Sequence, residues 1–136
     1  MRFADTNILI YSVSPLPADA AKCTVAAALL QVPDLALSVQ VLQEFYVQAT
    51  RPTRPQHLDH DDAVAFIQCW LRFPVQENTV ALFQAALTAK VRFQISFWDA
   101  AIIEAARAAG CRQVLSEDLN PGQDYDGVVV INPFAA

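Results

Sequence analysis

Short apolar runs alternate along the chain with stretches whose apolar residues recur every three or four positions. The short runs have the length and composition of buried strands: residues 2–6, 35–38, 74–77, 113–116 and 128–131. Apolar positions at helical spacing predict helices over residues 19–30, 42–49, 61–71, 80–91 and 96–106. Such an alternation is typical of an α/β fold with a parallel sheet covered by helices on both faces.

Two proline-containing segments interrupt this pattern. A turn region carrying Pro15 and Pro17 follows the first strand, and the segment Arg51 to Pro55 must end the helix before it, because neither of its prolines fits a helix interior. No repeat or linker divides the 136 residues, so we expect one domain over residues 1–136. No apolar run approaches the roughly 20 residues that cross a bilayer, and Asp5 comes too early for a signal peptide. We therefore expect a cytoplasmic protein with no membrane partner.

The charge balance limits the ways in which the chain can bind a polyanion. Fourteen acidic residues against nine basic ones give a net charge of −5, which disfavours non-specific binding to nucleic acid. A phosphate-bearing substrate would have to be reached through metal ions or a few placed arginines. Arg51 and Arg54 are candidates because they follow Glu44 closely, although exposed loop arginines need no such role.

Four acidic residues occupy the positions where parallel α/β sheets bind ligands. Asp5 ends the first strand, Glu44 lies in the helix after the second, Asp99 lies in the first turn of the last helix, and Asp118 follows the fourth strand. Ligands bind beyond the carboxyl ends of such strands. Clustered carboxylates repel one another unless cations neutralise them, and oxygen ligands favour Mg²⁺ or Mn²⁺. Such ions would activate water and stabilise a leaving oxygen in phosphodiester cleavage.

Each acid also has an ordinary structural interpretation. Asp99 follows Ser96 by three residues, as in a capping box. Glu44 alone would be a solvated helix residue, and Asp5 and Asp118 would belong to turns. Trp98 could stack on a base, but we expect it to pack inside the protein. The metal hypothesis therefore depends on the four acids as a set.

Four segments resemble PIN-domain ribonucleases of the kind that act as toxins in VapBC toxin–antitoxin pairs. They are residues 5–9 (DTNIL), residues 38–45 around Glu44, residues 95–103 (ISFWDAAII) and residues 115–122 (LSEDLNPG). Together they extend from the first strand to the approach to the last. The resemblance implies a three-layer α/β/α fold around a parallel sheet of about five strands.

The resemblance also implies Mg²⁺- or Mn²⁺-dependent endonuclease cleavage of RNA. Asp5 and Asp99 would be the principal metal ligands, Glu44 would bind the metal directly or through water, and Asp118 would complete the pocket. Supporting positions follow by the same match: Asn7 and Ser116 as residues that orient the carboxylates, and Glu117 and Asp124 as nearby acids.

Partners follow from the resemblance as well. Toxins of this kind form homodimers and are silenced by a VapB-like antitoxin, whose C-terminal segment approaches the acidic site in a hetero-oligomer. A cationic partner suits a chain with a charge of −5. The acidic composition favours one structured RNA as the substrate over general RNA degradation.

Other functions remain open at this point. A haloacid-dehalogenase-like phosphatase also begins with an aspartate after its first strand, but it needs a second acid where Asn7 stands and a basic residue after a later strand. A receiver-like phosphoacceptor module also needs that basic residue, and Lys22 and Lys90 both lie in helical segments. A PIN-domain nuclease of RNA processing, without toxicity, is a further alternative. We favour the toxin ribonuclease.

Overall fold

Five strands form one parallel sheet in the order β3-β2-β1-β4-β5. In the computed structural model, which describes residues 1–135, the strands are β1 (Arg2–Ala4), β2 (Leu35–Ser38), β3 (Val75–Gln76), β4 (Gln113–Leu115) and β5 (Val129–Ile131). All five lie within the segments predicted as strands, and only their ends differ by a residue or two. The parallel sheet is therefore confirmed.

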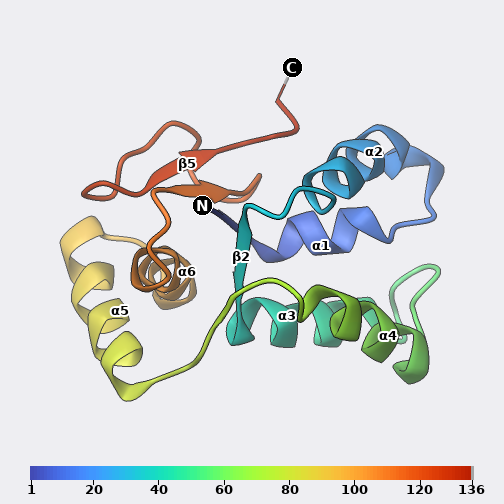
Figure 1. Ribbon diagram of the computed structural model, residues 1–136, viewed down its shortest axis with the longest axis horizontal. Helices are drawn as coiled ribbons and strands as arrows, with labels where there is room; N and C mark the ends of the chain where they lie inside the picture. The colour runs from blue at the N-terminus through green and yellow to red at the C-terminus, as the bar shows by residue number, and fades with distance from the viewer. Residues whose placement is uncertain (136) are drawn as a thin grey trace.

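Six α-helices and one 3₁₀ turn connect the strands of the described chain. They are α1 (Thr6–Ser12), the turn η1 (Pro17–Asp19), α2 (Ala20–Leu29), α3 (Val39–Ala49), α4 (His60–Trp70), α5 (Val80–Phe93) and α6 (Phe97–Ala108). Helices α5 and α6 pack together on one side of β2, whereas α1 to α4 lie on its other side (Figure 1). The predicted three-layer α/β/α arrangement is confirmed.

Side-chain caps explain where the helices begin. The side-chain oxygens of Ser38, Asp59, Thr79 and Ser96 each accept a hydrogen bond from the backbone N–H three residues later, at the starts of α3, α4, α5 and α6. Such a bond satisfies a donor that has no partner within the helix. Helix α3 ends at Ala49, before the proline-containing segment that was predicted to break it.

Helix α1 is the element that the sequence pattern missed. We expected only a turn region between the first strand and the helix near residue 19, but Asp5 caps a helix of seven residues. Ile8, Leu9 and Ile10 are all buried in succession, so the segment lacks the polar face that marks an amphipathic helix. The consequence for the site is that Asn7 and Tyr11 lie one turn apart on the same helix.

The core fills both sides of the sheet. Phe3, Phe45, Ile103, Leu115 and Tyr125 are among its largest fully buried side chains. No helix within residues 1–135 is both long and apolar enough to cross a membrane.

The register of the two central strands sets the geometry of one sheet edge. Ala4 at the end of β1 pairs with Leu115 at the end of β4, and the backbone N–H of Asp5 donates to the Leu115 carbonyl at 3.0 Å. Since both strands run in the same direction, the next residues, Asp5 and Ser116, emerge side by side at their carboxyl ends.

Candidate active site

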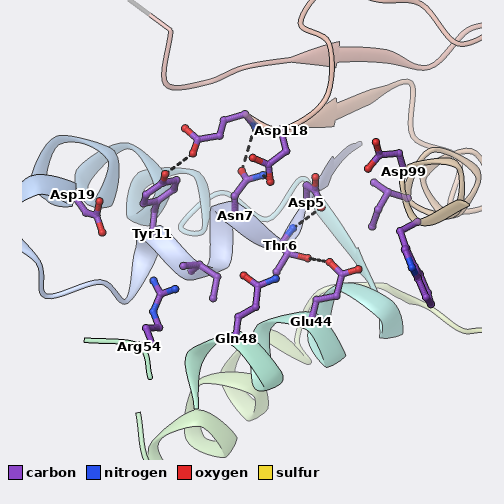
Figure 2. A pocket seen from close by; sticks show the side chains of 14 residues that line it. Asp5, Thr6, Asn7, Tyr11, Asp19, Glu44, Gln48, Arg54, Asp99 and Asp118 are labelled. Atoms are coloured by element: carbon purple, nitrogen blue, oxygen red, sulfur yellow. Dashed lines mark hydrogen bonds between the residues drawn. The ribbon is translucent and has the colours of Figure 1, made fainter. Parts of the chain in front are cut away.

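An acidic pocket opens at this edge of the sheet. The cavity has a volume of about 420 Å³ and is lined from the β1–α1 junction, α3, the start of α6 and the segment after β4. Asp5, Glu44, Asp99 and Asp118 all line it (Figure 2). Four carboxylates from four separate segments of the chain therefore share one cavity.

Asp5 is the most buried of these acids, with 7% of its surface exposed. One carboxylate oxygen accepts from the backbone N–H of Thr6 at 2.7 Å, and the other accepts from the Ser116 hydroxyl at 2.7 Å. Burial raises the pKa of Asp5 to about 6, the nearby charges of Glu44 and Asp118 add to the rise, and the two hydrogen bonds oppose it. The folded protein thus disfavours the charge on Asp5.

Glu44 is held in place by hydrogen bonds to both of its oxygens. Thr6 donates its hydroxyl to Oε2 at 2.6 Å, and Gln40, one turn earlier on α3, donates its amide to Oε1 at 2.8 Å. A freely solvated helix residue would not be fixed in this way. Thr6 therefore contacts both carboxylates, since its backbone N–H donates to Asp5 and its hydroxyl donates to Glu44.

Asp99 lies at the capped start of α6 and also lines the acidic pocket, so both interpretations of this residue from the sequence apply. Its backbone N–H donates to the Ser96 hydroxyl at 3.1 Å, which caps α6, while the residue lines the acidic pocket. Partial burial raises the pKa of Asp99, and the charges of Asp118 and Glu44 also raise it. The cap fixes the backbone and leaves the carboxylate to the pocket.

Ser116 and Asn7 organise the segment after β4. The buried Ser116 hydroxyl donates to Asp5 and accepts from the backbone N–H of Asp118 at 3.1 Å. Asn7 donates its amide to the Asp118 carboxylate at 3.2 Å and to Ser116 at 3.3 Å, and its amide oxygen accepts from the backbone N–H of Glu117 at 3.4 Å. The first turn of α1 and the end of β4 are thereby joined around Asp118.

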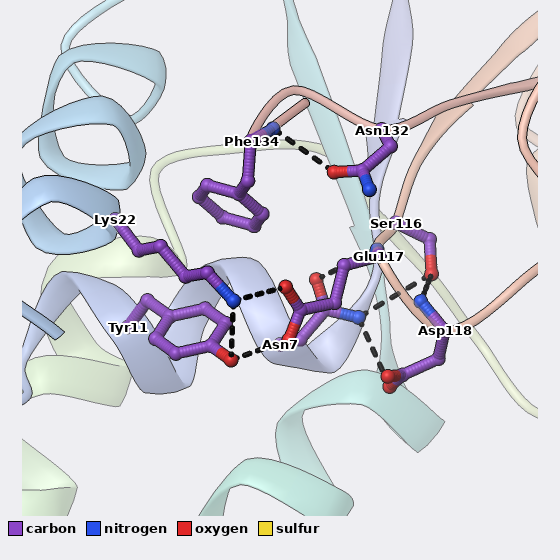
Figure 3. Close-up of polar contacts among 8 residues, drawn as sticks. All are labelled: Asn7, Tyr11, Lys22, Ser116, Glu117, Asp118, Asn132 and Phe134. Atoms are coloured by element: carbon purple, nitrogen blue, oxygen red, sulfur yellow. Dashed lines mark hydrogen bonds and ion pairs between the residues drawn. The ribbon is translucent and has the colours of Figure 1, made fainter. Parts of the chain in front are cut away.

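Glu117 makes a separate contact with a lysine on α2. Lys22 donates to its carboxylate at 2.7 Å, and the Tyr11 hydroxyl donates to the other carboxylate oxygen (Figure 3). Burial acts to raise the pKa of Glu117, but the hydrogen bonds from Lys22 and Tyr11 outweigh it and hold that pKa below its usual range. The Lys22 ammonium also lies 4.8 Å from the centre of the Tyr11 ring. Glu117 is thus neutralised within the protein, unlike the four acids of the pocket.

Three predicted site residues do not line the acidic pocket: Ser116, which donates to Asp5, and Asp124 and Arg51. Asp124 accepts a hydrogen bond from the backbone N–H of Gly127 at 2.6 Å and so closes the turn before β5, which corrects its placement near the acids. Arg51 lines a neighbouring groove, whereas Arg54 lines the pocket itself. Turn chemistry explains Asp124 without a ligand.

Trp98 contradicts the expectation that it packs inside the protein, because 66% of its surface is exposed at the rim of the pocket. Sequence reasoning also missed Tyr11, Lys22 and Gln40. Only Gln40 carried a local signal, since it lies four residues before Glu44 and hence on the same helix face.

A model of the PIN domain family matches residues 2–123 of the chain. The chain belongs to the PIN domain family. No curated protein sequence matches it.

Solved structures of similar fold extend over most of this PIN domain. Mycobacterium tuberculosis VapC20, described as a toxin that cleaves the sarcin–ricin loop, is 22% identical with a TM-score of 0.66, over 87% of this chain and 92% of that one. A toxin–antitoxin complex from Klebsiella pneumoniae is 18% identical with a TM-score of 0.70, over 98% of each chain. FitAcB from Neisseria gonorrhoeae is 17% identical with a TM-score of 0.62, over the whole of both chains. At these identities the likeness is one of fold.

The donor set of the pocket suits a hard divalent cation. Its ionisable lining comprises one basic side chain, Arg54, and six acidic ones: Asp5, Asp19, Glu44, Asp99, Glu117 and Asp118. Carboxylate oxygens are the ligands that Mg²⁺ and Mn²⁺ prefer, and a cation would offset the burial and the neighbouring negative charges that raise the pKa of Asp5. Within residues 1–135, no three acidic, histidine or cysteine side chains stand close enough to hold an ion as they are placed.

We predict that Asp5→Asn stabilises the metal-free protein at pH 7 by about 1–2 kcal/mol. The folded state disfavours the Asp5 charge, and a pKa raised from 3.8 to about 6 makes the ionised form the costly one at neutral pH. Asparagine removes the charge and remains a good helix cap. Urea denaturation with chelator present measures the change. Asp34→Asn, at an exposed acid, should shift stability by less than about 0.5 kcal/mol, and a less stable Asp5→Asn protein would contradict this account of the pocket.

A second prediction concerns the contact between Lys22 and Glu117. Lys22→Met keeps an unbranched side chain but removes the ammonium that binds Glu117 and lies over the Tyr11 ring. We expect the amides of residues 116–119 to exchange with deuterium faster in this variant, because the segment loses its tie to α2. Hydrogen exchange followed by mass spectrometry measures this effect. The control is Lys90→Met at an exposed site on α5. Equal protection of residues 116–119 in both variants would show that the ion pair between Lys22 and Glu117 does not hold this segment against α2.

Proposed function

We propose that this PIN domain is a divalent-metal-dependent endoribonuclease that acts as the toxin of a toxin–antitoxin pair. The observation that carries the proposal is the acidic pocket, in which the buried Asp5 shares one cavity with Glu44, Asp99 and Asp118 from three other segments. A fold does not by itself assign a function. The argument therefore depends on the chemistry of these side chains together with membership of the family.

Asp5 and Asp99 would hold the metal ion, Glu44 would bind it directly or through water, and Asp118 would complete the site. A bound Mg²⁺ or Mn²⁺ supplies an activated water and stabilises the leaving oxygen of a phosphodiester. The protein's own contribution is orientation: Ser116 and the Thr6 backbone hold Asp5, and Thr6 and Gln40 hold Glu44. Residues that fix ligands in this way support metal affinity.

Arg54 is the side chain best placed to contact the RNA backbone. It is the basic residue of the acidic pocket, so it would bind a phosphate beside the scissile one. A net charge of −5 provides little long-range attraction for RNA, which favours a structured RNA as the substrate. Cleavage of the sarcin–ricin loop by VapC20 is an example among proteins of this fold.

The toxin role follows from likeness to proteins that work in pairs. The Klebsiella structure is a toxin–antitoxin complex, and we propose an equivalent VapB-like antitoxin, a homodimer and a toxin–antitoxin hetero-oligomer for this chain. A basic segment of the antitoxin would complement the acidic pocket. The protein would act in the cytoplasm, where its RNA substrate is. A PIN-domain nuclease of RNA processing would use the same pocket without such a partner.

The arrangement of the lysines disfavours a phosphatase of the haloacid-dehalogenase type. Such an enzyme needs a basic residue after a later strand, but Lys22 binds Glu117 and neither Lys22 nor Lys90 lines the pocket. Arg54, which does line it, follows helix α3 and not a strand. Asn7, at the position of the required second acid, is engaged by Ser116 and Asp118.

The test is cleavage of total cellular RNA by the purified protein, free of antitoxin. We expect discrete products with Mg²⁺ or Mn²⁺ and none with chelator. Asp99→Asn and Glu44→Gln should each slow cleavage roughly 100-fold or more, since each removes a carboxylate of the metal site. Primer extension on the products measures rate and position together.

Asp124→Asn is the matched control for these variants. It removes a carboxylate of the same type outside the pocket and keeps an acceptor for the Gly127 N–H, so its activity should equal that of the unaltered protein. Cleavage that survives in folded Asp99→Asn and Glu44→Gln proteins would show that another site or a contaminant is responsible.

A further inference from the structure

A second groove adjoins the acidic pocket. It has a volume of about 360 Å³, and we call it the tryptophan groove; its lining is Gln40, Gln43, Glu44, Val47, Gln48, Arg51 and Trp98. Glu44, Gln48 and Trp98 also line the acidic pocket. The two cavities therefore adjoin, and Trp98 stands between the groove and the carboxylates.

Trp98 presents an indole ring to solvent at this junction. With 66% of its surface exposed, it stands on the first turn of α6, one residue before Asp99. The Phe97 ring packs edge-on against it with ring centres 5.1 Å apart. Val47, 56% exposed, adds apolar surface from α3. A broad aromatic surface that the protein leaves uncovered beside candidate catalytic acids is suited to stacking on a planar ring.

The rest of the groove is lined by amides and one cation. Gln48, on α3 one turn after Glu44, lines both cavities. Its backbone carbonyl accepts from the N–H of Arg51, but its side-chain amide makes no hydrogen bond within residues 1–135 and is free to donate and accept. Gln40, by contrast, is committed to Glu44. Arg51 at the end of α3 provides the positive charge. An aromatic face, an adaptable amide and an arginine are the three groups with which proteins bind an unpaired nucleotide.

We propose that the tryptophan groove binds the nucleobase next to the scissile phosphate, stacked on Trp98, with its edge hydrogen-bonded by Gln48 and the following phosphate contacted by Arg51. This inference rests on the proposed ribonuclease function and specifies its substrate as an unpaired, extruded base. The groove adjoins the acidic pocket and places amides and an arginine beside the indole ring, and this combination favours a nucleotide over a peptide.

The test uses the fact that the chain has two tryptophans. Trp70 is buried, so Trp70→Phe leaves Trp98 as the fluorescent reporter of the groove. Octamers of riboadenylate and ribouridylate are titrated with chelator present, which prevents cleavage, beside an octamer of abasic ribose phosphate. Stacking predicts quenching of Trp98 fluorescence by the base-bearing octamers and none by the abasic one. Quenching to the same extent by the abasic octamer would overturn the proposal.

Fluorescence anisotropy of labelled octamers gives a second readout with Trp70 intact. Trp98→Ala should weaken binding of the base-bearing octamers roughly 5- to 150-fold, as expected for loss of one stacked base, and Trp98→Phe should restore most of it. The abasic octamer should bind Trp98→Ala and unaltered protein equally. Phe66→Ala, at an aromatic residue 38% exposed on α4 and outside both cavities, is the matched control and should bind as the unaltered protein does. Unchanged affinity in Trp98→Ala would refute the stacking.

The outcomes separate this inference from the function on which it rests. RNA cleavage without base-dependent quenching would overturn the tryptophan groove as a base site and leave the ribonuclease standing. Quenching by an arginine-rich octapeptide but by none of the RNA octamers would also overturn the inference and assign the groove to a protein partner. Base-dependent quenching together with metal-dependent cleavage supports both.

Discussion

The hydrogen bond from the Ser116 hydroxyl to the Asp5 carboxylate joins the ends of the two central strands. The parallel register of β1 and β4 brings these residues together, and the same hydroxyl accepts from the backbone of Asp118. Asn7, in the first turn of α1, donates its side-chain amide to the same Ser116 hydroxyl and to the Asp118 carboxylate. The sheet edge, α1 and the segment after β4 are therefore one polar network around a buried carboxylate, and the geometry of the acidic pocket depends on that network.

The acidic residues that would bind a cation also make the folded protein less stable when no cation is bound. Burial and neighbouring acids act against the charge on Asp5, and Arg54 is the one basic side chain that lines the pocket beside its acids. Glu117 shows the alternative, since Lys22 and Tyr11 neutralise it. That the other carboxylates lack such partners is the physical argument for a cation-binding role. Strain of this kind is typical of sites that are completed by a ligand.

The parts of the site that depend on local spacing could be predicted from the sequence. The positions of Asp5 and Asp99 could be predicted. Asp5 stands at the end of a strand and Asp99 three residues after a capping serine, and strand and helix periodicity place both at the sheet edge. Helix α1 could not be predicted, since Ile8, Leu9 and Ile10 are buried in succession and hide the helical period in a segment of seven residues. The contact between Lys22 and Glu117 joins residues 95 positions apart, and no local pattern encodes such a pairing. Trp98 was misjudged because helical spacing identifies an apolar residue without telling whether another element covers it.

The central claim is that the acidic pocket binds a divalent cation through Asp5 and Asp99. The most direct measurement is an anomalous difference map from crystals of the protein soaked in Mn²⁺. We predict a strong peak within coordination distance of both carboxylates. A map with no peak in the pocket, or with manganese bound only elsewhere, for example beside His60 and Asp61 at the start of α4, would contradict the account.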